Sequence, residues 1–492
     1  MTRVDELLKR GAPEAIALVD RDRTLTYAAL DASVDRVAAG LARRIAPGDR
    51  VAVWLPKSVE AVVALFAVAR AGGIAVPVNP LLKGAQVGHI LSDSGAALLL
   101  THEPRRKLLE HPTCPVLSVE RDWASLHDDG PPPAEAPGDD ALAALLYTSG
   151  STGRPKGVMV THTNLLVGAR SVASYLGTDP TDRVLAVLPL SFDFGLSQLT
   201  TAFHAGASAI LLEYLLPRDV PAAVARHGAT QLALVPPLWA QMVELDWPRP
   251  NTLRTLSASG GRMPLPVVRA LRRLFPQARL HLMYGLTEAF RSTTLPPELV
   301  DRHPDSIGRA IPDAEVRVVR PDGTETAPGE PGELVHGGPL VTRGYWRDPE
   351  RTAERFRPAP PAMRWRGLAV WSGDTVVRDE QGLLYFVGRT DEMIKTMGTR
   401  VSPTEIEEVA LASGLVGAAV ALGIPDPTLG ARIRLVVVPR RAPDALEDAL
   451  LRHFRRTAPA YMLPADIRVV AELPLGPNGK IDRTRVRADH GA

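Results

Sequence analysis

Cysteine is nearly absent from this chain, because Cys114 is the only one among 492 residues. A single cysteine excludes an intrachain disulfide and a cysteine-rich metal site, and it favours a reducing compartment. Lysine is also scarce, since seven of the 57 lysine and arginine residues are lysines. Lys156 and Lys480 therefore stand out in a chain whose usual cation is arginine.

Long apolar runs and patches of like charge are missing as well. The most apolar stretch, residues 61–78, is interrupted by Arg70 and by two glycines, so it is too short to span a bilayer. The N-terminal residues lack the apolar core of a signal peptide. The net charge is +2, and the basic residues are scattered, unlike the stripes that bind nucleic acid. The sequence predicts a cytoplasmic enzyme without a membrane or nucleic-acid partner.

The first part of the chain alternates between strand and helix patterns. Apolar spacing indicates helices at 27–41 and 59–71, and apolar runs bounded by turn residues indicate strands at 50–55 and 74–78. A strand, a helix and a strand at this spacing form a βαβ unit, which implies a parallel sheet with helices on its faces. We therefore expect an α/β fold.

The rest of the chain extends this pattern and then changes. A second strand–helix series spans 163–244, and short β-rich runs follow at 307–346. The length exceeds what one hydrophobic core fills. We expect a large N-terminal domain, residues 1–390, with two βαβ-built sheets and a small antiparallel or barrel-like β subdomain. Residues 391–492 should form a C-terminal α+β domain.

Residues 145–157, LLYTSGSTGRPKG, link one apolar run to another. Glycines in this stretch let backbone N–H groups crowd around an anion, and the hydroxyls and the lysine add donors and charge. The order is not that of Walker A, because no Lys-Ser or Lys-Thr pair follows a GxxxxG pattern. We interpret the stretch as a phosphate-binding loop, with a flexible Ser/Gly surface loop as the alternative. Its candidate residues are Thr148, Ser149, Gly150, Ser151, Thr152, Gly153 and Lys156.

Four further stretches accompany this loop. They read MYGLTEA at 283–289, WSGDT at 371–375, GRTDEMIKTMGTRVSPTEIEEV at 388–409 and PLGPNGKIDRT at 474–484. Together the five stretches resemble the AMP-forming adenylating superfamily of acyl-CoA synthetases, amino-acid-adenylating enzymes and luciferases, over almost the whole chain. The resemblance implies an acid–thiol ligase: ATP and a carboxylic acid give an acyl-AMP and pyrophosphate, and a thiol then takes the acyl group.

The resemblance also implies an ATP site. The loop and Lys156 would hold the β- and γ-phosphates, and Thr287 the α-phosphate. Asp374 would bind the ribose hydroxyls, and Glu288 a Mg²⁺ ion, because a bare carboxylate there would repel ATP. A turn aspartate and a solvated helix-start acid are the structural alternatives for these two carboxylates. The remaining ATP-binding candidates are Gly260, Gly261, Tyr284, Gly285, Phe386 and Arg389.

Lys480 lies in a Pro/Gly-rich loop, and such loops usually just turn the chain. The resemblance instead makes it the catalytic lysine that bridges the substrate carboxylate and the α-phosphate. Asp391 would be the hinge about which a mobile C-terminal domain rotates. That rotation would withdraw Lys480 and bring Gly398 over a tunnel for the thiol of phosphopantetheine or CoA.

The prediction of the substrate class rests on Asp193, in the sequence PLSFDFGL. The Phe-Asp pair resembles the amino-acid-activating branch, in which this aspartate binds the substrate amine. A buried carboxylate needs a cationic partner, and Arg291 is the rival to a substrate ammonium. Similar SFD and FRST patterns also occur in exosortase-associated acyl-CoA ligases. The other residues expected at the acyl pocket are Phe194, Ser197 and Met283.

These observations favour a free-standing enzyme that activates an amino acid, or a small amino-bearing acid, as its adenylate. The acyl group would then pass to the phosphopantetheine of a carrier protein supplied in trans. The main alternative is an acyl-CoA ligase for a small or medium carboxylic acid, in which Arg291 neutralises Asp193. A catalytically silent binding protein of the same fold is a third hypothesis, against which the presence of Lys480, Glu288 and Asp374 argues.

Overall fold

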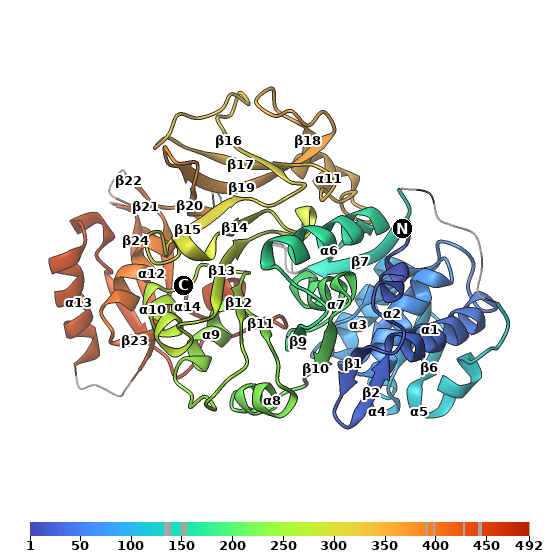
Figure 1. The fold of residues 1–492 in the computed structure, drawn as a ribbon. Coiled ribbons are helices and arrows are strands. Elements are labelled where there is room, and N and C mark those ends of the chain that lie inside the picture. The colour runs from blue at the N-terminus through green and yellow to red at the C-terminus, as the bar shows by residue number, and fades with distance from the viewer. Residues whose placement is uncertain are drawn as a thin grey trace.

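The computed structural model describes residues 1–131, 138, 140–148, 155–389, 392–396, 399–426, 429–440 and 445–491. Figure 1 shows an α/β region in the centre and on the right, an antiparallel β region at the top and the C-terminal domain on the left. The mixed α/β architecture with a smaller C-terminal α+β domain confirms the predicted fold class. Within the described ranges, none of the helices combines the length and apolarity needed to cross a membrane.

The first sheet has the strand order β6-β5-β3-β4-β7-β8. Its first five strands run parallel, and β8 (Lys156–Thr161) turns back antiparallel to β7 (Leu142–Thr148). The predicted phosphate loop is thus the connection of a hairpin at the edge of a parallel sheet. The other strands are β3 (Arg50–Trp54), β4 (Ile74–Pro77), β5 (Ala96–Thr101) and β6 (Val116–Ser118), with helices α2 (Val59–Arg70) and α3 (Gly84–Ser94) between them.

The second sheet is built on six parallel strands, in the order β13-β12-β11-β9-β10-β1, with β2 antiparallel beyond β1. Helix α7 (Asp193–Ala205) lies beside α6 (His162–Leu176), and every residue of α7 from Asp193 to Phe203 is buried. Its side chains enter the cores of both sheets. The strands are β1 (Ile16–Asp20), β2 (Arg23–Thr26), β9 (Arg183–Ala186), β10 (Ser208–Leu211), β11 (Gln231–Leu234), β12 (Thr255–Ala258) and β13 (Arg279–Tyr284), and the other helices are α8 (Asp219–His227), α9 (Pro236–Met242) and α10 (Leu265–Leu274).

The β-rich segment forms an antiparallel ladder, β16-β17-β19-β20-β15. This ladder continues through β14 into β13, so the segment predicted as an antiparallel or barrel-like subdomain is joined edge to edge to the second sheet. At this junction the Tyr284 side chain at the end of β13 reaches Asp374 of β19. The strands are β14 (Thr293–Leu295), β15 (Ser306–Ala310), β16 (Glu315–Val319), β17 (Pro331–Gly337), β18 (Phe356–Pro358), β19 (Leu368–Arg378) and β20 (Leu384–Arg389).

The C-terminal domain has its own three-stranded sheet and its own core. In this sheet β24 pairs antiparallel with β23 and parallel with β25. Helices α12 and α13 pack on it through buried Ile406, Leu450 and Phe454. The elements are β21 (Ile394–Thr396), β22 (Thr399–Val401), α12 (Pro403–Ala412), β23 (Val416–Asp426), β24 (Gly430–Pro439), α13 (Leu446–Thr457), β25 (Asp466–Val469) and α14 (Arg483–His490).

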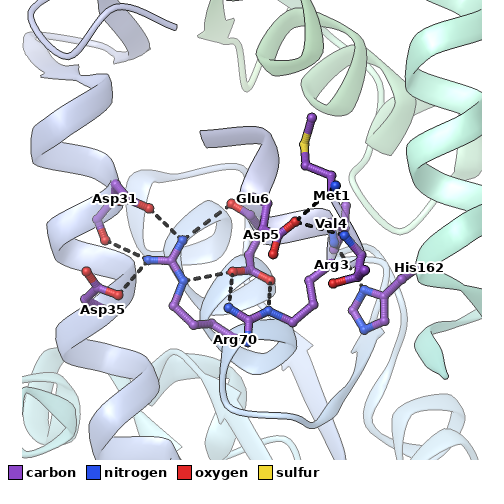
Figure 2. Close-up of polar contacts among 10 residues, drawn as sticks. Met1, Arg3, Val4, Asp5, Glu6, Asp31, Asp35, Arg70 and His162 are labelled. Carbon is purple, nitrogen blue, oxygen red and sulfur yellow. Dashed lines mark hydrogen bonds and ion pairs between the residues drawn. The ribbon is translucent and has the colours of Figure 1, made fainter. Parts of the chain in front are cut away.

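A buried ionic cluster fastens the N-terminal turn η1 (Val4–Lys9) to three helices (Figure 2). Arg70 of α2 pairs with Asp5 at 2.9 Å and with Asp31 of α1 (Tyr27–Ala42) at 2.6 Å. Asp5 is fully buried, and Arg70 is 2% exposed. His162 at the start of α6 accepts a hydrogen bond from the backbone N–H of Val4 at 3.2 Å through its Nδ1. Sequence analysis had treated Arg70 only as an interruption of an apolar run.

Candidate active site

The predicted phosphate loop begins and ends at paired residues. Strand β7 ends at Thr148 and β8 begins at Lys156, and these two residues are paired in the antiparallel register. The hydroxyl of Thr148 is buried and has no hydrogen-bond partner among the described residues. The other loop candidates, Ser149, Gly150, Ser151, Thr152 and Gly153, lie outside the described residues.

Lys156 and Glu288 form an ion pair of 3.2 Å, although 132 residues separate them in the chain. The same carboxylate oxygen, Oε1, accepts a hydrogen bond from the Tyr345 hydroxyl at 2.6 Å. Burial raises the pKa of Glu288, but the charge of Lys156 and the Tyr345 hydrogen bond outweigh it, so the pKa is lowered. Glu288 is therefore an ionised carboxylate at a buried position, which is the donor that Mg²⁺ prefers. Tyr345 had not been predicted from the sequence.

The turn after β13 positions the next residues. A short helix, η3 (Thr287–Ala289), presents Thr287 and Glu288, both 8% exposed. Gly285 precedes it at a close approach of the chain, since a Cβ there would lie 3.2 Å from the Cα of Arg291. The sequence YGLTE thus brings its threonine and its glutamate to the end of a parallel strand, the edge at which α/β sheets bind ligands.

Asp374 of β19 lies at the centre of the predicted nucleotide site. Its carboxylate accepts a hydrogen bond from the Tyr284 hydroxyl and lies 3.8 Å from Nη1 of Arg389 on the neighbouring strand. Burial, with the nearby carboxylate, raises the pKa of Tyr284. One face of the Tyr284 ring is stacked on His336 at 5.9 Å, and Phe386 lies 6.3 Å away. His336 is buried and was not predicted from the sequence.

Lys480 reaches this site from the C-terminal domain. Its side chain lies against Gly260, where a Cβ would come within 2.6 Å of the Lys480 Cε, and its Nζ lies 4.7 Å from the centre of the Phe192 ring. Gly260 has a φ of 89°, which favours glycine. Burial lowers the pKa of Lys480, and the charge of Asp193 opposes this shift. The turn that holds the ATP-binding candidates Gly260 and Gly261 therefore also makes room for the lysine.

Asn79 fixes the loop that carries Lys480, and it had no sequence signal. Its amide nitrogen donates to the carbonyl of Pro477 at 2.9 Å and to the side chain of Asn478 at 3.2 Å. Asn79 follows β4 of the first sheet, so the contact joins residues 398 positions apart. Only the folded chain reveals this pairing, because nothing in the sequence around Asn79 marks it.

Asp193 is the first residue of α7, where the helix dipole favours a negative charge. It is 4% exposed, and its Oδ1 has no hydrogen-bond partner among the described residues. Burial raises the pKa of Asp193, while the charges of Arg291 and then Lys480 oppose that rise. Arg291 is 2% exposed, and its guanidinium stacks on the Phe194 ring at 4.4 Å. Asp193 and Arg291 thus face the same buried region, and Nε and Nη2 of Arg291, like Oδ1 of Asp193, have no hydrogen-bond partner among the described residues.

Beyond Phe194, a cavity of about 30 Å³ lies between α6, α7 and strands β9, β11, β12 and β13. The predicted residues Phe194, Ser197 and Met283 all line it. Gln198 and Thr201 also line it, and sequence analysis missed them. Phe194, Ser197, Gln198 and Thr201 follow the i, i+3, i+4, i+7 spacing of one helix face, and this spacing could have identified them.

The structure brings most predicted site residues together. The described candidates from β7, β8, the Gly260 turn, the end of β13, β19, β20, α7 and the Lys480 loop all belong to one region at the junction of the sheets. Gly261 lies beside Gly260, with space for a Cβ 3.5 Å from Pro236. The predicted hinge, Asp391, and the predicted tunnel residue, Gly398, lie outside the described residues.

Family comparisons agree with this site. A model described as "AMP-binding enzyme" matches residues 8–346, and one described as "AMP-binding enzyme C-terminal domain" matches residues 405–480. The chain belongs to the AMP-binding enzyme family. As a member it is an adenylate-forming ligase, and the resemblance recognised in its five motifs is confirmed.

Relatives within the family differ in length and acceptor. The chain is 33% identical to the salicyl-AMP ligase / salicyl-S-ArCP synthetase of Mycobacterium tuberculosis, covering 97% of this chain and 88% of that protein. It is 34% identical to the feruloyl-CoA synthase of an Amycolatopsis species, covering 98% and 97%. It is 31% identical to tyrocidine synthase 3 of Brevibacillus parabrevis, but it spans only 7% of that protein's length.

Solved structures match the whole chain. ATP-bound MatB from Rhodopseudomonas palustris superposes with a TM-score of 0.90 at 27% identity, covering 100% of this chain and 99% of that one. The o-succinylbenzoate CoA synthetase MenE from Bacillus subtilis, in complex with ATP and magnesium, gives a TM-score of 0.87 at 29% identity, covering 99% of both chains. The arrangement of both domains is therefore shared with these enzymes.

Proposed function

We propose that this enzyme is an AMP-forming acyl-CoA ligase that activates a small carboxylic acid without an amino group. The charge balance of the acyl site carries the proposal. Asp193 is buried, and two protein cations, Arg291 and Lys480, already act on its charge. The formal charges of the three sum to +1, which one substrate carboxylate neutralises. A zwitterionic amino acid would leave that charge uncompensated in a buried site.

Two relatives of similar length support a CoA acceptor, whereas the salicyl-AMP ligase / salicyl-S-ArCP synthetase, covered to 88%, is named for ArCP. The feruloyl-CoA synthase and the MenE o-succinylbenzoate CoA synthetase are both named for CoA, and this chain covers 97% and 99% of them. The peptide synthase that it matches is far longer, so that match concerns one segment of a larger protein. These relatives favour the acyl-CoA ligase over the aminoacyl hypothesis that the sequence alone had favoured.

The first half-reaction joins the acid to AMP. A substrate carboxylate oxygen attacks the α-phosphorus of ATP, a new C–O–P linkage forms, and pyrophosphate leaves. Lys480 would lie between the carboxylate and the α-phosphate and reduce their repulsion. One unscreened like-charge pair at ~4 Å costs about 4 kcal/mol at an effective dielectric of 20, which is about three decades of rate. Thr287 would donate a hydrogen bond to the same phosphate.

The described residues fit ATP and Mg²⁺. Glu288 is an ionised, buried carboxylate beside Lys156, so it would ligate the metal while Lys156 holds a phosphate. The metal, when bound, would neutralise charge on the leaving pyrophosphate. Asp374, oriented by Tyr284 and near Arg389, would accept hydrogen bonds from the ribose hydroxyls. Tyr284 has one face on His336, which leaves its other face for the adenine.

The second half-reaction transfers the acyl group. The thiolate of CoA would attack the acyl carbonyl, a thioester would form, and AMP would leave. We propose that the C-terminal domain, residues 391–492, rotates about Asp391 between the two steps, which withdraws Lys480 and brings Gly398 to the thiol. This rotation would break polar contacts between the domains, among them Asn79 with the Lys480 loop, Arg262 with Glu408 of α12, and Glu244 with Arg440.

Two measurements test the proposal. Pyrophosphate release is compared for fatty acids, aryl acids, α-amino acids and β-amino acids, and the best acid is then supplied with CoA or with a phosphopantetheine-bearing carrier protein. We expect an amine-free acid to be best and CoA to be turned over efficiently. An amino acid as the best substrate, or turnover with the carrier alone, would contradict the proposal.

Variants then separate the two roles of Asp193. If Arg291 is its partner, D193N and R291Q should each lower stability, and the double variant should recover part of the loss. If Asp193 binds a substrate ammonium, D193N should instead lose activity with amino acids only. D219N is the matched control, because Asp219 also begins a helix, α8, but makes only local contacts with Leu215 and Leu216.

A further inference from the structure

The acyl cavity exposes mostly apolar surface, so the polar side chains on its lining stand out. Ser197, Gln198 and Thr201 of α7 face it, together with Thr255 and Ser257 of β12. Gln198 is 4% exposed and Thr201 is 3% exposed. A purely aliphatic acyl chain would displace water from these groups without replacing their hydrogen bonds.

Gln198 is held in one orientation. Its amide nitrogen donates to the carbonyl of Ala233 at 2.8 Å, and a carbonyl can only accept, so this contact identifies the nitrogen of the side chain. The other atom, Oε1, is buried and has no hydrogen-bond partner among the described residues. Gln198 therefore presents a fixed acceptor that only a donor can satisfy.

Thr201 adds a second unpaired group to the same cavity. Its hydroxyl is buried and lacks a partner in the part of the chain that the structure describes. A hydroxyl both donates and accepts, so Thr201 adapts to its ligand. The Gln198 oxygen accepts a hydrogen bond, and the Thr201 hydroxyl can donate or accept one. Together they match a ligand group that can itself both donate and accept. An alcohol has this property, an ammonium only donates, and a methyl group does neither.

We infer that the acid activated here carries a hydroxyl group on its acyl chain, and that Gln198 and Thr201 are the residues that select it. The inference rests on the proposed function and specifies its substrate class as a small hydroxylated carboxylic acid. The hydroxyl donates to Gln198 Oε1, while the carboxylate lies at the other end of the pocket, toward Lys480. The small volume of the cavity, about 30 Å³, limits the distal part of the acid to a few atoms.

Paired acids test this inference. Initial rates of pyrophosphate release give kcat/KM for butyrate against 3-hydroxybutyrate and 4-hydroxybutyrate, for benzoate against 4-hydroxybenzoate, and for 4-aminobutyrate. Leaving a buried acceptor unpaired costs a factor of roughly ten to a hundred in binding the transition state. We expect at least one hydroxylated acid to exceed its unsubstituted partner by roughly that factor.

Near-isosteric variants test whether Thr201 and Gln198 cause the preference for hydroxylated acids. T201V and Q198M remove the unpaired groups with little change of volume, and each should bring the ratio of the two rates close to one. T200V is the matched control: Thr200 is the adjacent residue of α7, is fully buried, and lines a different cavity, so this variant should keep the wild-type ratio. The ratio of rates is measured on one enzyme sample, so partial unfolding of a variant does not alter it.

The outcomes separate the inference from the proposed function. If unsubstituted acids are preferred, or if T201V and Q198M leave the ratio unchanged, the inference is wrong while acyl-CoA formation still supports the proposed function. If 4-aminobutyrate or another amino acid is best, both are wrong. If no acid releases pyrophosphate, the proposed function fails, and the inference fails with it.

Discussion

Gly260→Ala is the sharpest test of how Lys480 reaches the reaction. The added Cβ would lie 2.6 Å from Cε and 3.1 Å from Nζ of Lys480, closer than carbon atoms of side chains approach one another. The lysine tip is flexible, so we expect the side chain to move away while the domain remains folded. The variant should therefore remove the ammonium group from the site without removing the residue.

The magnitude follows from two effects. Losing a cation ~4 Å from the transferring phosphate costs about 4 kcal/mol, so adenylation should fall by up to about three decades. The φ of 89° adds a conformational cost of about 1–2 kcal/mol to folding. Gly261→Ala is the matched control, because its Cβ would meet Pro236 at 3.5 Å, an ordinary contact. Gly261→Ala should lose much less of the adenylation rate than Gly260→Ala, because its added methyl group does not meet Lys480.

Two assays and one further variant decide the matter. ATP–pyrophosphate exchange reports adenylation, and thioester formation from synthetic acyl-AMP reports the second step. Gly260→Ala should lose the first and keep most of the second. When Gly260→Ala is added to Lys480→Gln, the adenylation rate should fall little further, because the ammonium group is already gone. An equal loss in that background would refute the reasoning, since the glycine would then act through strain or nucleotide contact.

Three further predictions concern stability and the metal. Asp5→Asn removes the buried partner of Arg70 and should lower the free energy of unfolding by about 3–5 kcal/mol in urea titrations, whereas a loss under ~1 kcal/mol would contradict the buried-pair account. Burial lowers the pKa of His162 to about 4, so the unfolded chain binds its proton first and stability falls as pH drops from about 6.5 to 4, by on the order of 3 kcal/mol. His162→Asn should flatten that part of the stability–pH curve, and an unchanged slope would show that other groups cause it. Glu288→Gln should raise the Mg²⁺ concentration for half-maximal pyrophosphate release at least about tenfold, and an unchanged value would remove Glu288 from the metal site.

Most of the fold was predictable because it depends on local patterns. Helix α2 was expected at 59–71 and spans Val59–Arg70, and the strand expected at 74–78 is β4, Ile74–Pro77. Helix α7 lies within the strand–helix series predicted at 163–244, but the apolar pattern did not mark Asp193 as its first residue. That difference matters for the site, since it places Asp193 in the positive field of a helix N-terminus.

The contacts that depend on distant segments could not be predicted. The motifs indicated that Lys156, Glu288 and Lys480 share a site, but no pattern indicated that Lys480 lies against Gly260 or that Asn79 holds its loop. Neither pairing leaves a trace in local periodicity, since each joins residues hundreds of positions apart. The unpaired oxygen of Gln198 was missed for the same reason, because Gln198 looks like an ordinary helix residue until Ala233 is placed beside it.

The ion pair between Lys156 and Glu288 explains why ATP and Mg²⁺ should act as one ligand. Glu288 is buried and the Lys156 side chain is 22% exposed, and each neutralises the other at 3.2 Å. A phosphate alone would draw Lys156 away and leave a buried carboxylate unpaired, while a metal alone would leave the partly buried Lys156 ammonium unpaired. A ligand that carries both a phosphate and a metal would give Lys156 and Glu288 each a new partner, so neither charge would be left uncompensated. The pairing therefore favours the metal-bound nucleotide over either component.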